Sequence, residues 1–159
     1  ELKVGNQTFP STDIAAPDVT CGPTPAETPD LGIEFSLPET APISPDDFGS
    51  LNLELVLTNP TEQRIAFDSG IATGFILDLA GNIVAEGPTV GIPALGIPVD
   101  LEPGESTELG LVADTAACTP GAPSQLPSGD YLMVAEVFWS SGPGDFRDVY
   151  SPAFPITIT

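Results

Sequence analysis

Apolar and polar residues alternate with a period of two at the start of the stretch from residue 51 to residue 84. Leucine occupies every second position from Leu51 to Leu57, with mostly polar residues between. Successive side chains of a strand point to opposite faces, so the four leucines share one face. Asn59-Pro60 then ends the run, because proline cannot donate a ladder hydrogen bond and Asn-Pro favours a turn. The pattern predicts a half-buried strand over residues 51–58.

Two more strands and a hairpin are predicted directly after this turn. The extended runs cover residues 64–67 and 73–79. Ala80-Gly81-Asn82 is typical of a tight turn that leads into a short strand at Ile83-Val84. Ile65 and Phe67 are expected to point inward, and Phe75, Leu77 and Leu79 are expected to share one face.

The same alternation predicts strands elsewhere in the chain. The run 131–139 is apolar on both faces, so we expect it in the centre of its sheet. The segment 85–99 has neither a helical nor a strand period, and residues 140–147 are expected to turn the chain. The further strands are expected at 31–37, 107–113, 131–139 and 154–158.

These elements predict an all-β fold, an immunoglobulin-like β-sandwich of about seven strands without an amphipathic helix. The proline-rich residues 1–30 are expected to form an extended N-terminal arm, and residues 31–159 to form the sandwich. Tyr131 follows a Pro-Ser-Gly-Asp turn, which is the place of the tyrosine in a tyrosine corner. The alternative is a half-buried strand residue without that hydrogen bond.

The charge of the chain restricts its partners. There are 23 acidic residues against Lys3, Arg64 and Arg147, for a net charge of −20. Without a basic patch the chain cannot neutralise phosphates, so we expect neither nucleic acid nor an anionic membrane surface as a partner. No apolar run approaches 18 residues, so no transmembrane segment is expected. Two interpretations of the acidity remain, a surface that confers solubility and a surface that binds a basic partner.

Two cysteines, Cys21 and Cys118, lie in loop-like sequence beside glycine or proline. A disulfide between them would tie the arm to a distant loop, and the alternative is two free thiols. The disulfide implies an oxidising compartment. Together with a first residue, Glu1, that is not methionine, it favours an exported, extracellular or cell-envelope protein from which a leader has been removed. A lipid anchor before Glu1 is compatible with this interpretation.

Five short motifs occur in a fixed order between about residue 50 and residue 138. They are Leu57-Thr58-Asn59-Pro60-Thr61, Phe67-Asp68-Ser69-Gly70, the run from Phe75 to Val84, the turn from Leu101 to Ser106, and Pro127-Ser128-Gly129-Asp130-Tyr131. Their order and spacing resemble the bacterial intracellular proteinase inhibitor (BsuPI-like) family. This resemblance implies an all-β sandwich and, for the named member of the family, inhibition of serine proteases. The chain departs from the family pattern by lacking a tryptophan after Val84.

Most catalytic chemistries lack their residues in this chain. There is no histidine, so histidine-based triads, imidazole acid–base catalysis and histidine zinc sites are excluded, and two cysteines cannot build a zinc site that needs four thiolates. The carboxylate pairs Asp46-Asp47 and Asp145 with Asp148 could serve glycoside hydrolysis or Ca²⁺ binding, but both lie in predicted loops, where acids are usually solvated. We therefore expect no enzyme activity, no cofactor and no metal site.

The candidate partner contacts are apolar. Residues 90–98, VGIPALGIP, are uncharged and stiffened by proline, so they either pack under the sandwich or form a contact patch. Trp139, beside Phe138 and the turn Gly142-Pro143-Gly144, is a second candidate anchor, with a core position as its alternative. The candidate contact residues are Ile92, Pro93, Leu95, Ile97, Pro98 and Trp139.

Two functions are consistent with these patterns. The first is a non-enzymatic protein-binding or accessory module of an exported bacterial protein of the cell-envelope or lipoprotein type. The second, implied by the family resemblance, is a proteinase inhibitor that acts through the apolar loop 90–98.

Overall fold

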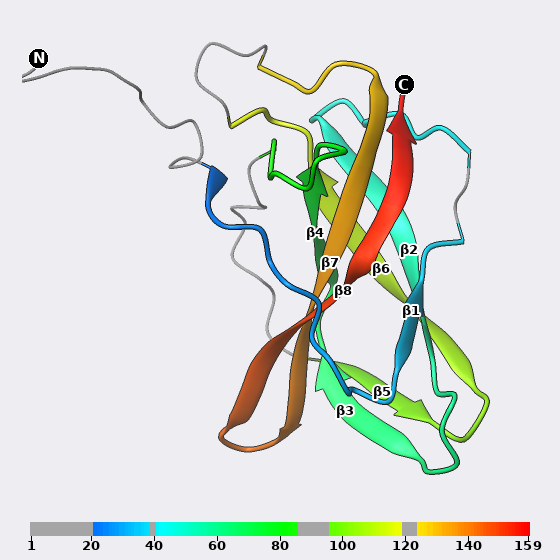
Figure 1. The fold of residues 1–159 in the computed structure, drawn as a ribbon. Helices are drawn as coiled ribbons and strands as arrows, with labels where there is room; N and C mark the ends of the chain where they lie inside the picture. The colour runs from blue at the N-terminus through cyan, green and yellow to red at the C-terminus, as the bar shows by residue number, and fades with distance from the viewer. Residues whose placement is uncertain (1–20, 39–40, 86–95, 119–123) are drawn as a thin grey trace, which may run out of the picture.

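The fold of the chain is all-β, as the sequence predicts (Figure 1). A computed structural model describes residues 21–38, 41–85, 96–118 and 124–159. Eight strands occur in these residues, compared with about seven predicted. They are β1 (Glu34–Ser36), β2 (Ser50–Thr58), β3 (Ile65–Ser69), β4 (Ala72–Leu77), β5 (Ile97–Leu101), β6 (Ser106–Asp114), β7 (Gly129–Gly142) and β8 (Asp145–Ile158).

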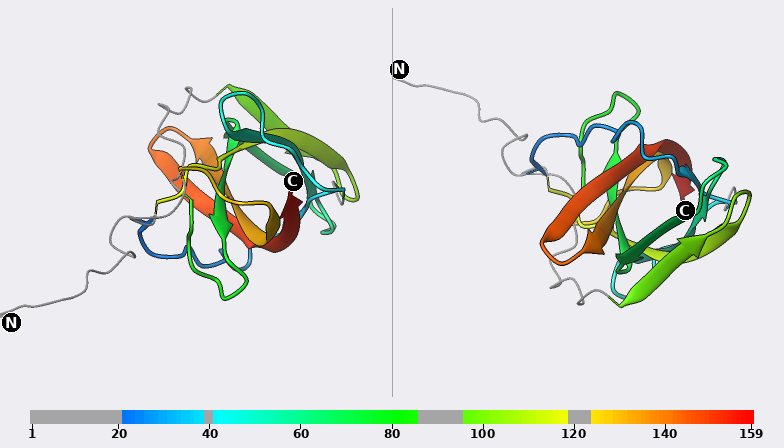
Figure 2. Two further views of the ribbon diagram at one scale, coloured as in Figure 1. Left: turned by 90° about the horizontal axis from the view of Figure 1, so that it is seen from above. Right: turned by 90° about the horizontal axis from the view of Figure 1, so that it is seen from below.

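The strands form a sandwich in which two layers are joined along one side. β1, β2 and β6 pair in that order, and β8, β7 and β4 pair in the other layer. β3 joins the second layer through Asp68 opposite Ser140 of β7, and β5 pairs with β3 at the edge. A short parallel pairing of β4 with β6 connects the layers. Viewed along the strands, the layers surround one interior (Figure 2).

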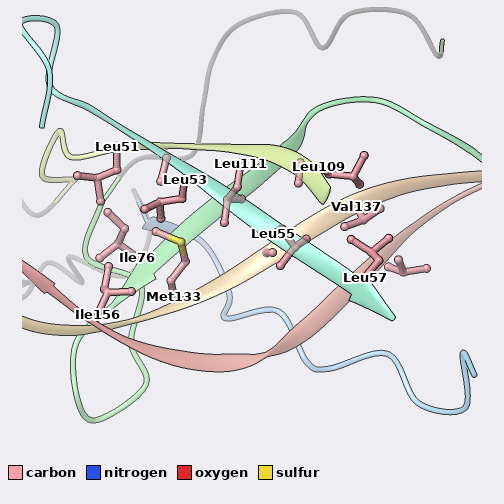
Figure 3. Packing of buried hydrophobic residues seen from close by; sticks show 14 of the residues in the cluster. Leu51, Leu53, Leu55, Leu57, Ile76, Leu109, Leu111, Met133, Val137 and Ile156 are labelled. Atoms are coloured by element: carbon pink, nitrogen blue, oxygen red, sulfur yellow. The ribbon is translucent and has the colours of Figure 1, made fainter. Parts of the chain in front are cut away.

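The main core fills that interior. The leucines of β2 are buried as predicted. They lie beside Leu109 and Leu111 of the paired strand β6, and they share one cluster with Met133 and Val137 of β7 in the other layer (Figure 3). Gly74 lies where β4 meets β6: a Cβ atom there would come within 3.1 Å of the Ala113 Cβ and the Met133 Sδ. The close approach of the two layers at this point therefore depends on glycine.

The structure corrects three expectations. β5 lies at the end of the segment 85–99, which was expected to have no period; Pro98 is tolerated there because β5 pairs only with β3 among the described residues. Residues 140–147 do not simply turn the chain, since β7 and β8 extend into them as a long hairpin. Leu79 is expected in the strand 73–79, on the same face as Phe75 and Leu77, but β4 ends at Leu77 and Leu79 is 66% exposed.

The turn after β2 is organised by a buried side chain, that of Asn59. Its amide nitrogen donates hydrogen bonds to the carbonyl oxygens of Gln63 at 2.7 Å and Leu101 at 3.0 Å, and its side-chain oxygen accepts one from the Thr61 backbone at 2.9 Å. The Asn59 backbone bonds to Gly104 and Glu105 in the turn before β6. Buried polar groups are stable when satisfied in this way, so Asn59 fixes two of the motifs against each other.

The predicted tyrosine corner is confirmed. Tyr131 lies at the start of β7, and its hydroxyl donates a hydrogen bond of 2.7 Å to the carbonyl oxygen of Pro127, four residues upstream. This bond ties the strand to the preceding turn, which is the function of such a corner in sandwich folds.

The predicted disulfide is also confirmed, and it fastens a strap across the second layer. Cys21 and Cys118 are bonded, with Cα atoms 5.5 Å apart and a sequence separation of 97. The strap, residues 22–33, also pairs with β8: the backbone N–H of Thr28 donates to the Tyr150 carbonyl at 3.1 Å, and the Tyr150 N–H donates to the Thr28 hydroxyl at 2.9 Å. Residues 21–30 of the predicted arm are thus attached to the sandwich, while residues 1–20 lie outside the described part.

The disulfide covers a second, smaller apolar cluster on the side of β4, β7 and β8 that faces away from the main core, called here the outward face. Leu77, Ile83, Cys118 and Val134 are buried in it, with Cys21, Phe75 and Leu132 packed against them. Disulfides persist in oxidising compartments, so the bond fits such a compartment. Within the described residues, no helix has the length and apolarity to cross a membrane.

Candidate protein-interaction surface

The structure places the candidate contact residues in three situations. Ile92, Pro93 and Leu95 lie outside the described residues. Ile97 and Pro98 belong to the edge strand β5, where Ile97 is half-buried and Pro98 is exposed. Trp139 lies in β7 and is only 6% exposed.

Trp139 points into the molecule, so it takes the core position, which was the alternative expected from the sequence. Its ring stacks on Phe67 of β3, with the ring centroids 3.6 Å apart. The guanidinium carbon of Arg147 lies 5.3 Å from the Trp139 ring centroid, a cation–π distance. The tryptophan therefore anchors β3 and the start of β8 to β7, and its ring offers little area to a partner.

Two phenylalanines near the end of the hairpin, Phe138 and Phe146, lie on the outward face. They lie on opposite strands of the β7–β8 hairpin with ring centroids 5.9 Å apart in an edge-to-face arrangement. Phe146 is 54% exposed and Phe138 is half-buried. The end of the hairpin projects to the side, away from β3 and β5, which reach similarly far at that end of the molecule (Figure 1). An exposed aromatic pair on a projecting hairpin resembles the anchors of protein interfaces.

Glu136 lies next to this pair on the outward face, and two side chains orient its carboxylate. The Thr73 hydroxyl donates a hydrogen bond of 3.2 Å to Oε1, and the Tyr150 hydroxyl donates one of 3.1 Å to Oε2. Burial, followed by the charge of Glu136, raises the pKa of Tyr150 to about 12, so the phenol stays protonated and remains a donor at neutral pH. The carboxylate is thus fixed in direction and half-buried.

The strand register completes the surface. Glu136 lies opposite Tyr150, Phe138 opposite Asp148, and Ser140 opposite Phe146. We call the resulting set the hairpin face. Its members are Glu136, Phe138, Phe146, Asp148 and Tyr150.

Pro98 is connected to the hairpin face through one row of residues across the sheet. Pro98 lies opposite Asp68 in β3, Asp68 opposite Ser140 in β7, and Ser140 opposite Phe146 in β8. A shallow groove of about 260 Å³ runs between β5, β3 and the end of β7 beside this row. The candidate Pro98 and the aromatic pair therefore lie at the same end of the molecule.

The two arginines in the described part of the chain are both engaged away from the hairpin face. Arg64 donates two hydrogen bonds of 2.7 Å to the carboxylate of Asp100, and this pairing lowers the pKa of Asp100 and raises that of Arg64. Arg147 lies over Trp139 on the inward side of the hairpin.

The other candidate carboxylates stabilise turns or side-chain contacts. Asp46 accepts hydrogen bonds from the backbone of Ser50 and Phe48, which lower its pKa, and from the Asn52 amide. Asp145 accepts one from Ser141. Among the described residues, no group of three acidic or cysteine side chains is arranged to hold a metal ion.

Sequence reasoning identifies Phe138 but misses Phe146, Glu136 and Tyr150 as parts of one surface. Phe146, Asp148 and Tyr150 alternate with the buried Val149, which is the signal that could have identified an outward-pointing set. The glycines and the proline within residues 140–147 conceal this alternation, because they indicate a turn there.

Comparisons with known proteins leave the function open. No family model and no curated protein matches the sequence. The β-glucosidase EmGH1 of Erythrobacter marinus is similar at 14% identity, with 80% of this chain and 15% of that chain covered and a TM-score of 0.40. A β-glucosidase of Listeria innocua in complex with glucose is 14% identical, with 79% of this chain and 16% of that chain covered and a TM-score of 0.36. The structural genomics target SoR45 is 17% identical, with 82% of this chain and 90% of that chain covered and a TM-score of 0.41.

The chain therefore spans only a small part of either glucosidase. At such low identities and TM-scores, the similarities do not support a shared fold or a shared function.

Proposed function

We propose that the chain is a non-enzymatic protein-binding module that contacts its partner through the hairpin face. The observation that supports this best is the exposure of Phe146, 54%, in edge-to-face contact with Phe138 on a projecting hairpin. Full burial of an exposed phenylalanine contributes about 1.5 to 3 kcal/mol, so covering the exposed 54% of Phe146 contributes roughly half of that. Aromatic side chains with a rigid neighbour lose little entropy on binding, so this pair is suited to act as an anchor.

The setting we propose is an exported bacterial protein of the cell-envelope or lipoprotein type. The Cys21–Cys118 disulfide supports it, because bonds of this kind form and persist outside the reducing cytosol. The net charge of −20 supports a protein partner and disfavours nucleic acid and anionic lipid.

The test is site-specific photo-crosslinking in cells that naturally produce the protein. A photoreactive phenylalanine analogue at position 146 should form a covalent adduct with one protein, and Phe138→Ala should weaken that adduct. Phe48 is the matched control, since it is 89% exposed and lies in the turn before β2, at the opposite end of the sandwich. Equal labelling from positions 146 and 48, or none from either, would contradict the proposal.

A second experiment distinguishes the binding module from the proteinase inhibitor that the family resemblance implies. The oxidised protein is titrated against a subtilisin-like and a trypsin-like protease, and residual activity is followed at equal and excess concentrations. Stoichiometric inhibition that is lost when residues 92–97 are replaced by Gly and Ser would favour the inhibitor. No inhibition at large excess would favour the binding module.

A further inference from the structure

We propose that the hairpin face binds an arginine side chain of a partner protein, with Glu136 and Asp148 as anionic ligands and Phe138 and Phe146 as aromatic neighbours. This inference rests on the proposed protein-binding function and specifies the chemistry of the partner. It is supported by the orientation of the Glu136 carboxylate, the aromatic pair, the charge of the chain and the positions of its own arginines.

The Glu136 carboxylate has the arrangement that a guanidinium requires. Each of its oxygens accepts one hydrogen bond from the protein, Oε1 from Thr73 and Oε2 from Tyr150. A carboxylate oxygen has two lone pairs, so one acceptor position remains on each oxygen. One unused acceptor position on each oxygen is the number that the two parallel N–H donors of arginine need. Because Thr73 and Tyr150 hold the group in place, little side-chain entropy is lost when it binds.

The aromatic pair supplies the second half of the recognition. Phe138 lies on the same face of β7 as Glu136, two residues further along, and Phe146 packs against its ring. A guanidinium plane can stack on such a ring while its edge reaches a carboxylate. The protein already uses this chemistry on the other side of the hairpin, where Arg147 lies over Trp139 at 5.3 Å.

Charge complementarity selects a cation for this face. The chain carries a net charge of −20, and the two described arginines are engaged with Asp100 and Trp139. Asp148 lies directly across the hairpin from Phe138, so a second carboxylate borders the rings. A surface of this sign attracts a basic segment over a distance set by ionic strength.

Arginine is favoured over lysine by geometry. The planar guanidinium can donate two hydrogen bonds to Glu136 and stack on phenylalanine at the same time, whereas an ammonium group is a compact, strongly hydrated charge. We therefore expect a lysine peptide to bind at least about fivefold more weakly than its arginine counterpart.

The experiment is an NMR titration of the ¹⁵N-labelled, oxidised chain with the blocked tripeptide acetyl-Gly-Arg-Gly-amide. The expected result is a saturable set of shifts at residues 136, 138, 146 and 148 that weakens as salt is added. The citrulline tripeptide, which is neutral and similar in shape, should produce no saturable shifts there. Shifts that are equal for arginine and citrulline, or that lie elsewhere on the chain, would overturn the inference.

Variants locate the binding group. Glu136→Gln keeps the shape of the side chain, with its oxygen as acceptor for one of the two hydroxyls and its NH2 group as donor to the other, but it removes the charge. It should weaken binding of the arginine peptide about tenfold. Glu54→Gln is the matched control, since Glu54 is an exposed strand carboxylate of β2, and it should leave the affinity unchanged. Equal losses from both variants would mean that only the overall charge matters and would overturn the site.

Failure of this inference is distinguishable from failure of the proposed function. If position 146 crosslinks a partner and Glu136→Gln leaves that adduct intact, the face binds protein but not through arginine. If position 146 crosslinks nothing while the arginine peptide still binds, the face recognises arginine and the binding function of the module is wrong.

Discussion

Both halves of β7 present side chains to the outward face, yet only one half is covered. In the first half, Leu132 and Val134 pack in the small cluster beneath the disulfide, and Val134 is only 4% exposed. In the second half, Glu136 and Phe138 lie on the same face and stay half-buried. The strand and its inward face are continuous across both halves, with Met133, Ala135 and Val137 fully buried.

The difference comes from segments that are distant in the sequence. The turn at residues 78–83 brings Ile83 onto the first half, and the Cys21–Cys118 bond fastens the strap over it. The strap then reaches Tyr150, where Thr28 pairs with β8, and Tyr150 stands at the border between the halves. The first half is therefore buried because the turn and the strap lie across it. No such segment among the described residues covers the second half, so its aromatic pair stays exposed.

Removing the disulfide should have the largest effect on this comparison. The replacement of both Cys21 and Cys118 by alanine should lower the free energy of unfolding by about 3 to 5 kcal/mol, because a cross-link over 97 residues restricts the unfolded chain. Urea denaturation of the variant and of the oxidised protein measures the difference. A reducing agent should bring the unmodified protein to the stability of the variant and leave the variant unaffected; a variant as stable as the oxidised protein would show that the covered half does not need the bond.

The next largest difference is expected when a large side chain is replaced by alanine in the covered half and in the open half of the outward face. Leu77→Ala in the covered half should cost about 2 to 4 kcal/mol, because Leu77 is 2% exposed and its removal leaves a cavity. Phe138→Ala in the open half should cost less than about 1.5 kcal/mol, since part of its ring is already in water. The midpoints of denaturant unfolding, at unchanged slope, give both values. Equal losses would mean that the open half is buried in solution.

Tyr150 at the border should give a moderate effect with a distinct pH dependence. Tyr150→Phe should cost about 0.5 to 1 kcal/mol at neutral pH through the lost hydrogen bond to Glu136. The pKa of Tyr150 is raised from its usual value of 10.0 to about 12, so the folded chain binds this proton more tightly than the unfolded chain. The stability it contributes is fully present below pH 10 and is lost as the pH rises from 10 to about 12.

Phenolate absorbance checks this prediction directly, because the chain has only two tyrosines. The Tyr150→Phe variant should lose the titration near pH 12, while Glu136→Gln should shift that titration downward. An unchanged titration in the Glu136→Gln variant would contradict the contact between the two side chains.

The smallest effect is expected at the most exposed aromatic of the open half. Phe146→Ala should change the free energy of unfolding by no more than about 0.5 kcal/mol, similar to Phe48→Ala in the turn before β2, because both rings are largely in water. Thermal unfolding of the two variants compares them. A loss at Phe146 that clearly exceeds the loss at Phe48 would assign Phe146 a structural role.

Period-two alternation was sufficient to predict most of the fold. The leucines of β2, the turn at Asn59-Pro60 and the tyrosine corner follow from local pattern, because each depends on neighbours close in the sequence. β5 was missed because Pro98 interrupts its pattern, and only the pairing with β3 shows that it is an edge strand, where proline is tolerated.

The candidate site was less predictable, for a physical reason. Whether Phe138 or Trp139 points outward depends on which face of β7 packs against the core, and contacts distant in the sequence decide this. Trp139 stacks on Phe67 of β3, and Val137 shares one buried cluster with the leucines of β2. The orientation of Glu136 requires Thr73 from β4 and Tyr150 from β8. No local pattern contains this three-strand arrangement, although the cysteine pairing could be inferred because only two cysteines were present.

The disulfide also determines how the molecule responds to mechanical tension. A pull applied at Cys21 and at Thr159 crosses the covalent bond to Cys118, so the 97-residue separation between the two cysteines adds nothing to the extension. Strands β1 to β6 all lie inside this covalent loop, and β7 and β8 lie outside it. Between these two points tension therefore lengthens the chain only through the residues after Cys118, which include both strands of the hairpin, and the strands before them are shielded from extension.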